Sequence, residues 1–289
     1  MYATPSDTVV FRPRTLGDLL ALLSRKPDIE IYAGGTFILG NQNEKYVSLP
    51  QSLAYIGQID DLSRIHRTER YFEIGAGVTL TKLLQAGPRA IPAVLMRAIA
   101  SIASSPVRNL ATIGGNICVP DRRLSTFPVL FLLDARLELR ELGSARWVPI
   151  SRIVGPEGNL LLSSTEVLTR IRIPLGDWKI QIYKSITNGP QLTRWSISFC
   201  GLAQTSRGVL TDFRCAFGSL GRILVRSREV ETELVSRKLP LPQRDQQMIC
   251  NLFDESLSTE YEMISAYQRT TAANLFRWFV TQLNLHAES

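Results

Sequence analysis

The chain has 289 residues, 45% of them hydrophobic and 20% charged, and a formal net charge of +7. This profile is typical of a soluble globular protein with a real core, and no apolar run approaches the ~20 residues that a membrane span needs. Lysine and arginine are scattered singly or in pairs, which argues against nucleic-acid binding. A solvated surface accounts for these scattered basic residues. An anionic cofactor or an acidic partner subunit would also fit the excess of positive charge.

Cysteine usage points to a reducing compartment. Cys118, Cys200, Cys215 and Cys250 lie far apart, with no CxxC pair and no zinc-like spacing. This spacing argues against a disulfide framework and against an iron–sulfur cluster in this chain. The N-terminal residues have neither the basic flank nor the apolar segment of a secretory signal. We therefore expect a cytoplasmic protein.

The first part of the chain alternates short strands and helices. Thr15 is placed to cap a helix that turns Leu16, Leu19, Leu20 and Leu23 to one face. Residues 167–173 alternate apolar and polar side chains, as a half-buried strand does. Further strands are predicted at 9–12, 30–33, 46–49, 53–58, 71–74, 137–141 and 146–150, and further helices at 79–84, 92–103 and 127–135.

The pattern changes near Leu175, Gly176 and Asp177. Three strands are predicted after this point, followed by three helices. The strands cover 180–186, 197–204 and 209–217, and the helices cover 227–236, 242–253 and 261–283. The sequence thus predicts an α+β protein with one domain at 1–176 and a second at 177–289.

Two glycine pairs follow apolar runs. Gly34 and Gly35 precede Thr36, and Gly114 and Gly115 lie between Thr112 and Asn116. Glycine allows successive N–H groups to point into one concavity and a ligand to approach the backbone closely. Such a nest suits phosphate oxygens, and two facing nests suit the pyrophosphate of a dinucleotide. Either pair alone is also compatible with an ordinary turn.

The chain shows no residues arranged for side-chain catalysis. Its two histidines, His66 and His286, lie in no Ser/His or Cys/His constellation, and no metal-ligand cluster is visible. The run Gly75-Ala76-Gly77 lacks the third glycine and the βαβ setting of a dinucleotide fingerprint, so it is predicted to be a strand-to-helix turn. A redox role would therefore depend on a cofactor.

The two glycine segments resemble the two FAD loops of the flavoprotein (medium) subunit of molybdenum hydroxylases, the xanthine dehydrogenase and carbon monoxide dehydrogenase family. The family pattern is AGGT followed by VRN-x-ATIGGN. This chain has AGGT at 33–36 and VRNLATIGGN at 107–116. Residues 50–60, the run EIGAGVT at 73–79, residues 169–174 and the Tyr183-Lys184 step are also similar to family segments.

The resemblance implies a fold, a cofactor and partners. The fold is a two-part FAD-binding domain of the PCMH-like type, followed by a three-stranded sheet with a helical bundle. FAD would be bound non-covalently, with Leu168 and Lys184 near the flavin end and a cation at Lys184 favouring the reduced flavin. The residues expected at FAD are Ile31, Tyr32, Ala33, Gly34, Gly35, Thr36, Phe37, Ile38, Ala111, Thr112, Ile113, Gly114, Gly115, Asn116, Ser125, Leu168 and Lys184.

Two positions depart from the family pattern. Ser125 stands where an aspartate usually follows the second loop in the family. The resemblance implies that this change would weaken one hydrogen bond to FAD, and Arg122 and Arg123 make the segment basic. Pro106 replaces a common glutamine before VRN. Cys118 is expected to be a small apolar filler rather than a redox thiol.

The resemblance implies an electron-transfer subunit, an oxidoreductase component that is active only in a complex. Substrate would be hydroxylated at a molybdenum cofactor on a large subunit. Electrons would pass through [2Fe-2S] clusters on a small subunit to FAD and then to NAD⁺ or another acceptor. The alternatives are a flavin-free structural subunit, which the change at Ser125 motivates, and a stand-alone flavin oxidoreductase. The sequence leaves the substrate, the final acceptor and the stoichiometry open.

Overall fold

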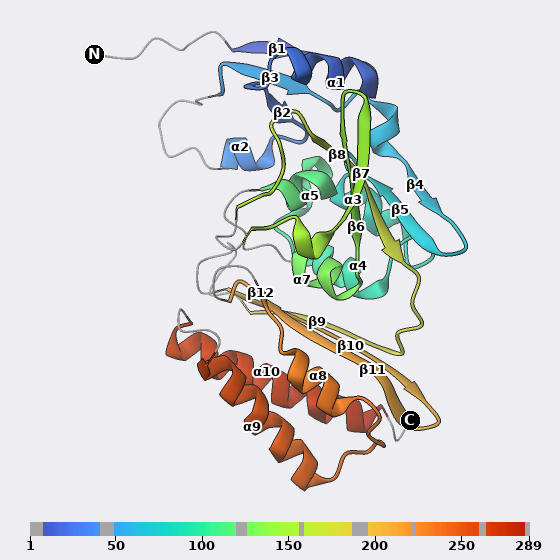
Figure 1. Ribbon diagram of the computed structural model, residues 1–289, viewed down its shortest axis with the longest axis vertical. Helices are drawn as coiled ribbons and strands as arrows, with labels where there is room; N and C mark the ends of the chain where they lie inside the picture. The colour runs from blue at the N-terminus through green and yellow to red at the C-terminus, as the bar shows by residue number, and fades with distance from the viewer. Residues whose placement is uncertain are drawn as a thin grey trace. The chain divides into compact units, whose positions relative to one another are not determined.

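The computed structural model describes residues 8–40, 49–119, 126–155, 159–186, 196–220, 224–259 and 264–286 (Figure 1). The chain forms two compact units. Unit 1 contains Met1–Ile91, Ile102–Asp121 and Asp134–Leu175. Unit 2 contains Pro92–Ser101, Arg122–Leu133 and Gly176–Ser289. The division of the chain into functional domains at 176/177 stays a prediction, and two earlier segments of the chain belong to the unit that contains the C-terminal residues.

Unit 1 begins with a small parallel sheet covered by one helix. Its strand order is β1 (Val9–Phe11), β3 (Ser52–Tyr55), β2 (Glu30–Tyr32). Helix α1 (Leu16–Arg25) begins at a capping box in which Thr15 accepts from the N–H of Asp18 while the Asp18 carboxylate accepts from the N–H of Thr15. Its buried face consists of the four predicted leucines.

A second, antiparallel sheet of unit 1 has five strands. Their order is β4 (Ile65–Arg67), β5 (Tyr71–Gly75), β8 (Val167–Pro174), β6 (Arg136–Glu141), β7 (Ser144–Pro149). Helices α3 (Leu80–Ala86), α5 (Ser105–Leu110) and α6 (Ile113–Cys118) belong to the same unit, as do α2 (Thr36–Gly40) and the 3-10 turns η1 (Asp60–Ser63) and η2 (Ile150–Arg152).

A buried carboxylate lies on the polar face of this five-stranded sheet. The β6–β8 register shifts after Glu138, which leaves Thr169 as the extra residue of a β-bulge. Glu138 is 3% exposed and accepts hydrogen bonds from Arg170 at 2.6 and 2.7 Å, from the Thr169 hydroxyl at 2.6 Å and from Arg140 at 3.0 Å. The bulge thus places a hydroxyl donor beside a carboxylate that two guanidinium groups neutralise.

Unit 2 is built on an antiparallel sheet in the order β12 (Leu224–Val225), β11 (Val209–Gly218), β10 (Ile197–Ser206), β9 (Ile180–Ile186). Helices α4 (Ala93–Ala100), α7 (Thr126–Leu132), α8 (Arg228–Leu234), α9 (Gln243–Thr259) and α10 (Ala266–Leu285) pack around it. Aromatic rings dominate its core: Phe253 and Phe276 stack with ring centroids 4.3 Å apart, and Phe199 meets Phe217 at 4.8 Å and Phe279 at 5.3 Å.

The expected elements are found, with differences that have local causes. The predicted three-stranded sheet gains a fourth strand, because the two-residue β12 pairs with β11. The predicted helix at 92–103 ends at Ala100, and Ala103 has a positive φ of 43°. Helices α2, α5 and α6 and strand β4 were not expected from the sequence. Most of the strand predicted at 46–49, the start of the helix predicted at 261–283 and the site residue Ser125 lie outside the described residues.

Candidate functional site

The first glycine segment connects β2 to α2. Gly35 has a positive φ of 67°, which L-amino acids with side chains rarely adopt. No described residue accepts a hydrogen bond from the N–H groups of Gly34, Gly35 or Thr36, and all three residues are half-buried. Backbone donors that are held in a turn and have no described acceptor suit a ligand with anionic oxygens.

The second glycine segment differs, because its backbone donors bind protein acceptors. Thr112 caps α6 by accepting from the N–H of Gly115 at 3.0 Å. The N–H groups of Ile113, Gly114 and Asn116 donate to the carbonyl oxygens of Val78, Ala76 and Thr112 at 2.8 to 3.0 Å. The expectation of two equivalent nests is therefore wrong for this segment: its amides stabilise the protein and are not free for phosphate.

The two glycines of this second segment have different surroundings. A Cβ at Gly114 would lie 2.6 Å from the Cβ of Ala76, so glycine there allows α6 to pack against the 75–77 turn. A Cβ at Gly115 would meet only the Thr112 hydroxyl, at 2.9 Å, and Gly115 is exposed without a positive φ. Gly114 thus supports the fold, whereas Gly115 leaves an open surface for a ligand.

The structure brings the two segments into direct contact. A Cβ at Gly34 would overlap the carbonyl group of Leu110, the residue that precedes the second segment. This contact joins parts of the chain about 80 residues apart and requires glycine at position 34. The first segment, whose amides have no acceptor among the described residues, and the exposed backbone of α6 at Gly115 belong to one unit.

Residues of the VRN motif hold the second segment in position. Arg108 donates to the carbonyl oxygens of Ile102 and Ala103, both at 2.6 Å, and to the Ser105 hydroxyl at 3.0 Å. Asn109 accepts from the Thr81 hydroxyl at 2.7 Å. The motif therefore orders the loop that leads to Leu110 and joins it to α3.

The departure at Pro106 fits the local backbone. Pro106 lies in the first turn of α5, where the N–H that proline lacks would have no intrahelical acceptor and where the fixed φ of proline suits a helix. The exchange of glutamine for proline is thus compatible with α5.

The other predicted site residues lie outside the two glycine pairs. Ile31 and Tyr32 are in β2, and Phe37 and Ile38 are in α2, so they adjoin the first segment. Leu168 is buried in β8 of unit 1, 5% exposed. Lys184 is in β9 of unit 2, where its Nζ lies 5.0 Å from the ring centroid of Trp278. The roles of Leu168 and Lys184 at a flavin stay predictions.

The 75–77 turn belongs to this site, although the sequence pattern predicted only a strand-to-helix turn there. Its backbone carbonyl groups support the second segment, since Ala76 accepts from Gly114. A run of small residues after a strand was the signal: it permits the close approach seen between Gly114 and Ala76.

The described residues include neither a membrane-spanning helix nor a metal-binding cluster. None of the described helices is long and apolar enough to cross a bilayer. Within the same part of the chain, no three His, Cys, Asp or Glu side chains gather in a way that could hold a metal ion.

Comparison with known proteins identifies a matching family model and several relatives. The family model for the FAD binding domain in molybdopterin dehydrogenase matches residues 5–176. The xanthine dehydrogenase FAD-binding subunit of Escherichia coli O157:H7 is 29% identical over 229 residues, 76% of each chain. The nicotinate dehydrogenase FAD-subunit of Eubacterium barkeri is 26% identical over 253 residues, 81% of this chain and 82% of that one.

A solved structure shows the same fold. One chain of the carbon monoxide dehydrogenase from Hydrogenophaga pseudoflava superposes with a TM-score of 0.84 at 20% sequence identity, over 98% of this chain and 99% of that chain. The predicted α+β fold class is thereby confirmed. The family model confirms the resemblance drawn from the glycine motifs, with FAD as the cofactor and an oxidoreductase as the class of enzyme. Because that model matches more than half of the sequence, the chain belongs to the family of FAD-binding domains of molybdopterin dehydrogenases.

Proposed function

We propose that this chain holds one non-covalent FAD at its two glycine segments and serves as the electron-transfer subunit of a molybdenum-containing hydroxylase. The observation that carries the proposal is the set of N–H groups at Gly34, Gly35 and Thr36 that have no acceptor among the described residues. Amide donors in a turn with a positive φ suit pyrophosphate oxygens. A cytoplasmic location goes with this role.

Each loop has a separate task in this proposal. The first segment donates backbone hydrogen bonds to phosphate. The second offers the exposed backbone surface at Gly115, and it supports the first through Leu110. The fit to FAD rests on the backbone donors of the first segment, and glycine at position 34 allows that segment to touch Leu110 beside the second. Leu168 and Lys184 remain the residues that family resemblance assigns to the flavin end.

Bound FAD would supply the redox chemistry, and the chain would bind and orient it. The relatives named as FAD subunits of xanthine and nicotinate dehydrogenases support a division of labour between chains. The molybdenum cofactor and [2Fe-2S] clusters then belong to a large and a small partner subunit. NAD⁺ or another acceptor would then receive the electrons from FAD.

Purification from the native host tests this function. The tagged chain should co-elute with two partner chains, with molybdenum and iron, and with FAD that acid releases intact. The chain alone should not oxidise a purine or an aldehyde. Chromatography of the acid extract, metal analysis and mass spectrometry of co-eluting chains are the measurements.

Two results would redirect the proposal. A flavin-free complex with the same partners would indicate a structural subunit. A lone chain with full substrate turnover and no molybdenum would indicate a stand-alone flavin oxidoreductase.

Replacing Gly115 by valine should weaken FAD binding by about tenfold or more and leave the chain folded. The valine side chain would stand on an exposed surface and block close approach of the ligand, while the helical φ at this position tolerates it. Replacing Gly114 by valine is the comparison, because its Cβ would collide with Ala76 and destabilise the fold. Flavin titration and circular dichroism separate the two effects, and normal FAD affinity in Gly115→Val would contradict the assignment of this loop.

A further inference from the structure

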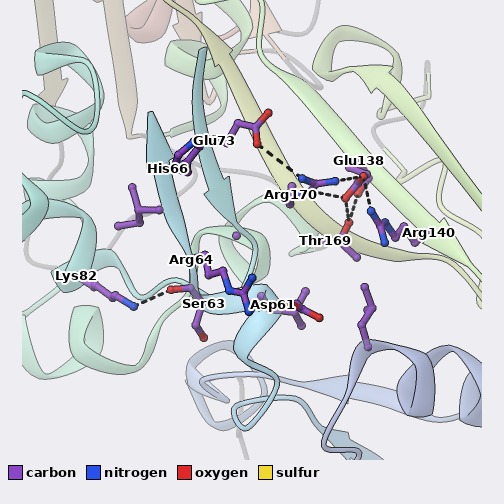
Figure 2. Close-up of a pocket in the computed structure, with 14 residues that line it drawn as sticks. Asp61, Ser63, Arg64, His66, Glu73, Lys82, Glu138, Arg140, Thr169 and Arg170 are labelled. Atoms are coloured by element: carbon purple, nitrogen blue, oxygen red, sulfur yellow. Dashed lines mark hydrogen bonds and ion pairs between the residues drawn. The ribbon is translucent and has the colours of Figure 1, made fainter. Parts of the chain in front are cut away.

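A cavity of about 820 Å³ lies in unit 1. It is lined by the polar face of the five-stranded sheet and by the wall that runs from η1 to the start of β4, the edge strand of that sheet (Figure 2). In Figure 2, Asp61 and Arg64 lie on that wall, and Glu138, Arg140 and Arg170 lie on the sheet. Neither glycine segment of the proposed FAD site lines this cavity.

The carboxylates that line the cavity are already occupied by basic partners. Asp61 pairs with Arg64 at 3.2 Å. Glu73 accepts from Nε of Arg172 at 2.7 Å. Glu138 accepts from two arginines and a threonine, as described above. Because these acceptors are satisfied, the cavity offers little to a cationic ligand.

Hydrogen-bond donors are in excess on the same walls. Four basic side chains and three carboxylates line the cavity. Lys82 makes no ion pair with a described carboxylate and donates only to the carbonyl oxygen of Ser63, at 2.7 Å. The Arg140 side chain is 35% exposed, and Nη2 of its guanidinium binds Glu138. An anionic oxygen of a ligand would bind the exposed part of this guanidinium.

The dimensions favour a small organic anion. The volume falls within the range of about 300 to 1,000 Å³ that is common for small-ligand sites. Leu16, Leu62 and Ile65 give the cavity an apolar part beside its charged part. Arginine binds phosphate oxygens with directed, charge-assisted hydrogen bonds.

We propose that this cavity binds the phosphate group of a small molecule of about mononucleotide size, at a site separate from the FAD loops. Arg140 and Arg64 bind the phosphate, and the apolar part accepts the uncharged portion of the ligand. The proposal does not depend on the function proposed above.

Calorimetric titration of the FAD-loaded chain tests it, with inorganic phosphate, adenosine 5′-monophosphate and adenosine as three separate probes. Loading with FAD fills the glycine segments, so that a phosphate ligand cannot bind there. We expect the monophosphate to bind more tightly than free phosphate, and adenosine to bind at least tenfold more weakly than the monophosphate. Binding of free phosphate as tight as that of the monophosphate would restrict the site to a free anion and overturn the size that we assign to the ligand.

Three variants, each of which replaces one arginine by glutamine, test where the phosphate binds. Arg140→Gln and Arg64→Gln should each weaken monophosphate binding about tenfold or more, because each removes a charged hydrogen bond to phosphate. Arg64 is a surface residue, 73% exposed in its side chain, so its replacement leaves the fold intact. Arg146→Gln is the matched control: Arg146 is on β7, pairs with Glu166 at 2.6 Å and does not line the cavity.

Four outcomes would overturn the proposal. They are absence of binding by either phosphate probe, equal binding of adenosine, an equal loss in Arg146→Gln, and unchanged binding in both Arg140→Gln and Arg64→Gln. Phosphate binding that is seen only without FAD, and that Arg140→Gln leaves unchanged, would assign the anion to the glycine segments instead. That result would contradict the separate site while supporting the FAD site.

Discussion

Replacement of Gly35 by valine is expected to reduce the affinity for FAD by about a hundredfold or more. Gly35 has a φ of 67°, and a Cβ there would overlap the ring and hydroxyl of Tyr32. A β-branched residue at a positive φ costs about 1 to 3 kcal/mol. The turn would therefore change its backbone conformation and direct the N–H groups of Gly34, Gly35 and Thr36 away from phosphate. Each charge-assisted hydrogen bond lost removes about 1.5 to 3 kcal/mol.

Gly40→Val is the matched control for this experiment. Gly40 is the last residue of α2, the short helix that follows Gly35. It is exposed, has no positive φ, and no atom of the described residues lies within 4 Å of an added Cβ. It should bind FAD as the unchanged chain does. The measurement is flavin fluorescence during titration of the flavin-free protein, with circular dichroism as the check on folding. Equal affinities for Gly35→Val and Gly40→Val would show that the amides of the first segment do not hold the cofactor.

Removal of the Glu138 carboxylate should destabilise the protein by about 3 to 5 kcal/mol. Glu138 is 3% exposed and neutralises Arg170 and Arg140 on the polar face of the sheet. Its replacement by alanine would leave two guanidinium groups and the Thr169 hydroxyl without their shared acceptor. Breaking one side of a buried ion pair is costly because the partner charge stays behind. Urea unfolding of Glu138→Ala measures the loss, and a change below 1 kcal/mol would show that water replaces the carboxylate without penalty.

The same carboxylate should make stability depend on acid pH. Burial by itself raises the pKa of Glu138, but hydrogen bonds from Arg170, Thr169 and Arg140 outweigh burial and lower this pKa from 4.5 to about 2. Because the folded-state pKa is the lower one, the contribution is complete above pH 4.5 and is lost as the pH falls from 4.5 toward 2. A shift of this size corresponds to about 3 kcal/mol.

Glu138→Gln isolates this effect, since it keeps the size of the side chain and removes its titration. The free energy of unfolding of the unchanged chain should fall more steeply than that of Glu138→Gln between pH 4.5 and 2. Above pH 5 the difference between the two should be constant. Parallel curves across the acid range would mean that other carboxylates cause the acid sensitivity.

Local patterns in the sequence were sufficient to predict several helices and strands. The spacing of Leu16, Leu19, Leu20 and Leu23 predicted the buried face of α1, and Thr15 caps that helix as expected. Thr79 likewise caps α3 by accepting from the N–H of Lys82. Period-two alternation predicted β8, which the structure places between β5 and β6. These elements can be predicted from the sequence because side-chain periodicity and capping act over only a few neighbouring residues.

Short elements depended on contacts that are distant in the sequence. Strands β4 and β12 have three and two residues, too few to show a periodic pattern, and they are ordered by pairing with β5 and β11. Helices α2, α5 and α6 have five or six residues and little helical stability of their own. Pairing and packing partners supplied later or earlier in the chain decide whether such segments form.

The glycine motifs of the site were likewise predictable in part from the sequence and in part decided by tertiary contacts. The sequence by itself identified the two segments and the family, because the motif residues and their spacing are visible in one dimension. Only the tertiary structure decided that amides of the second segment bind Ala76 and Val78 and that Gly34 touches Leu110. It also decided that no described residue accepts from the amides of the first segment. A glycine that permits close packing and a glycine that exposes the backbone are the same letter in a sequence, and only the neighbouring atoms distinguish them.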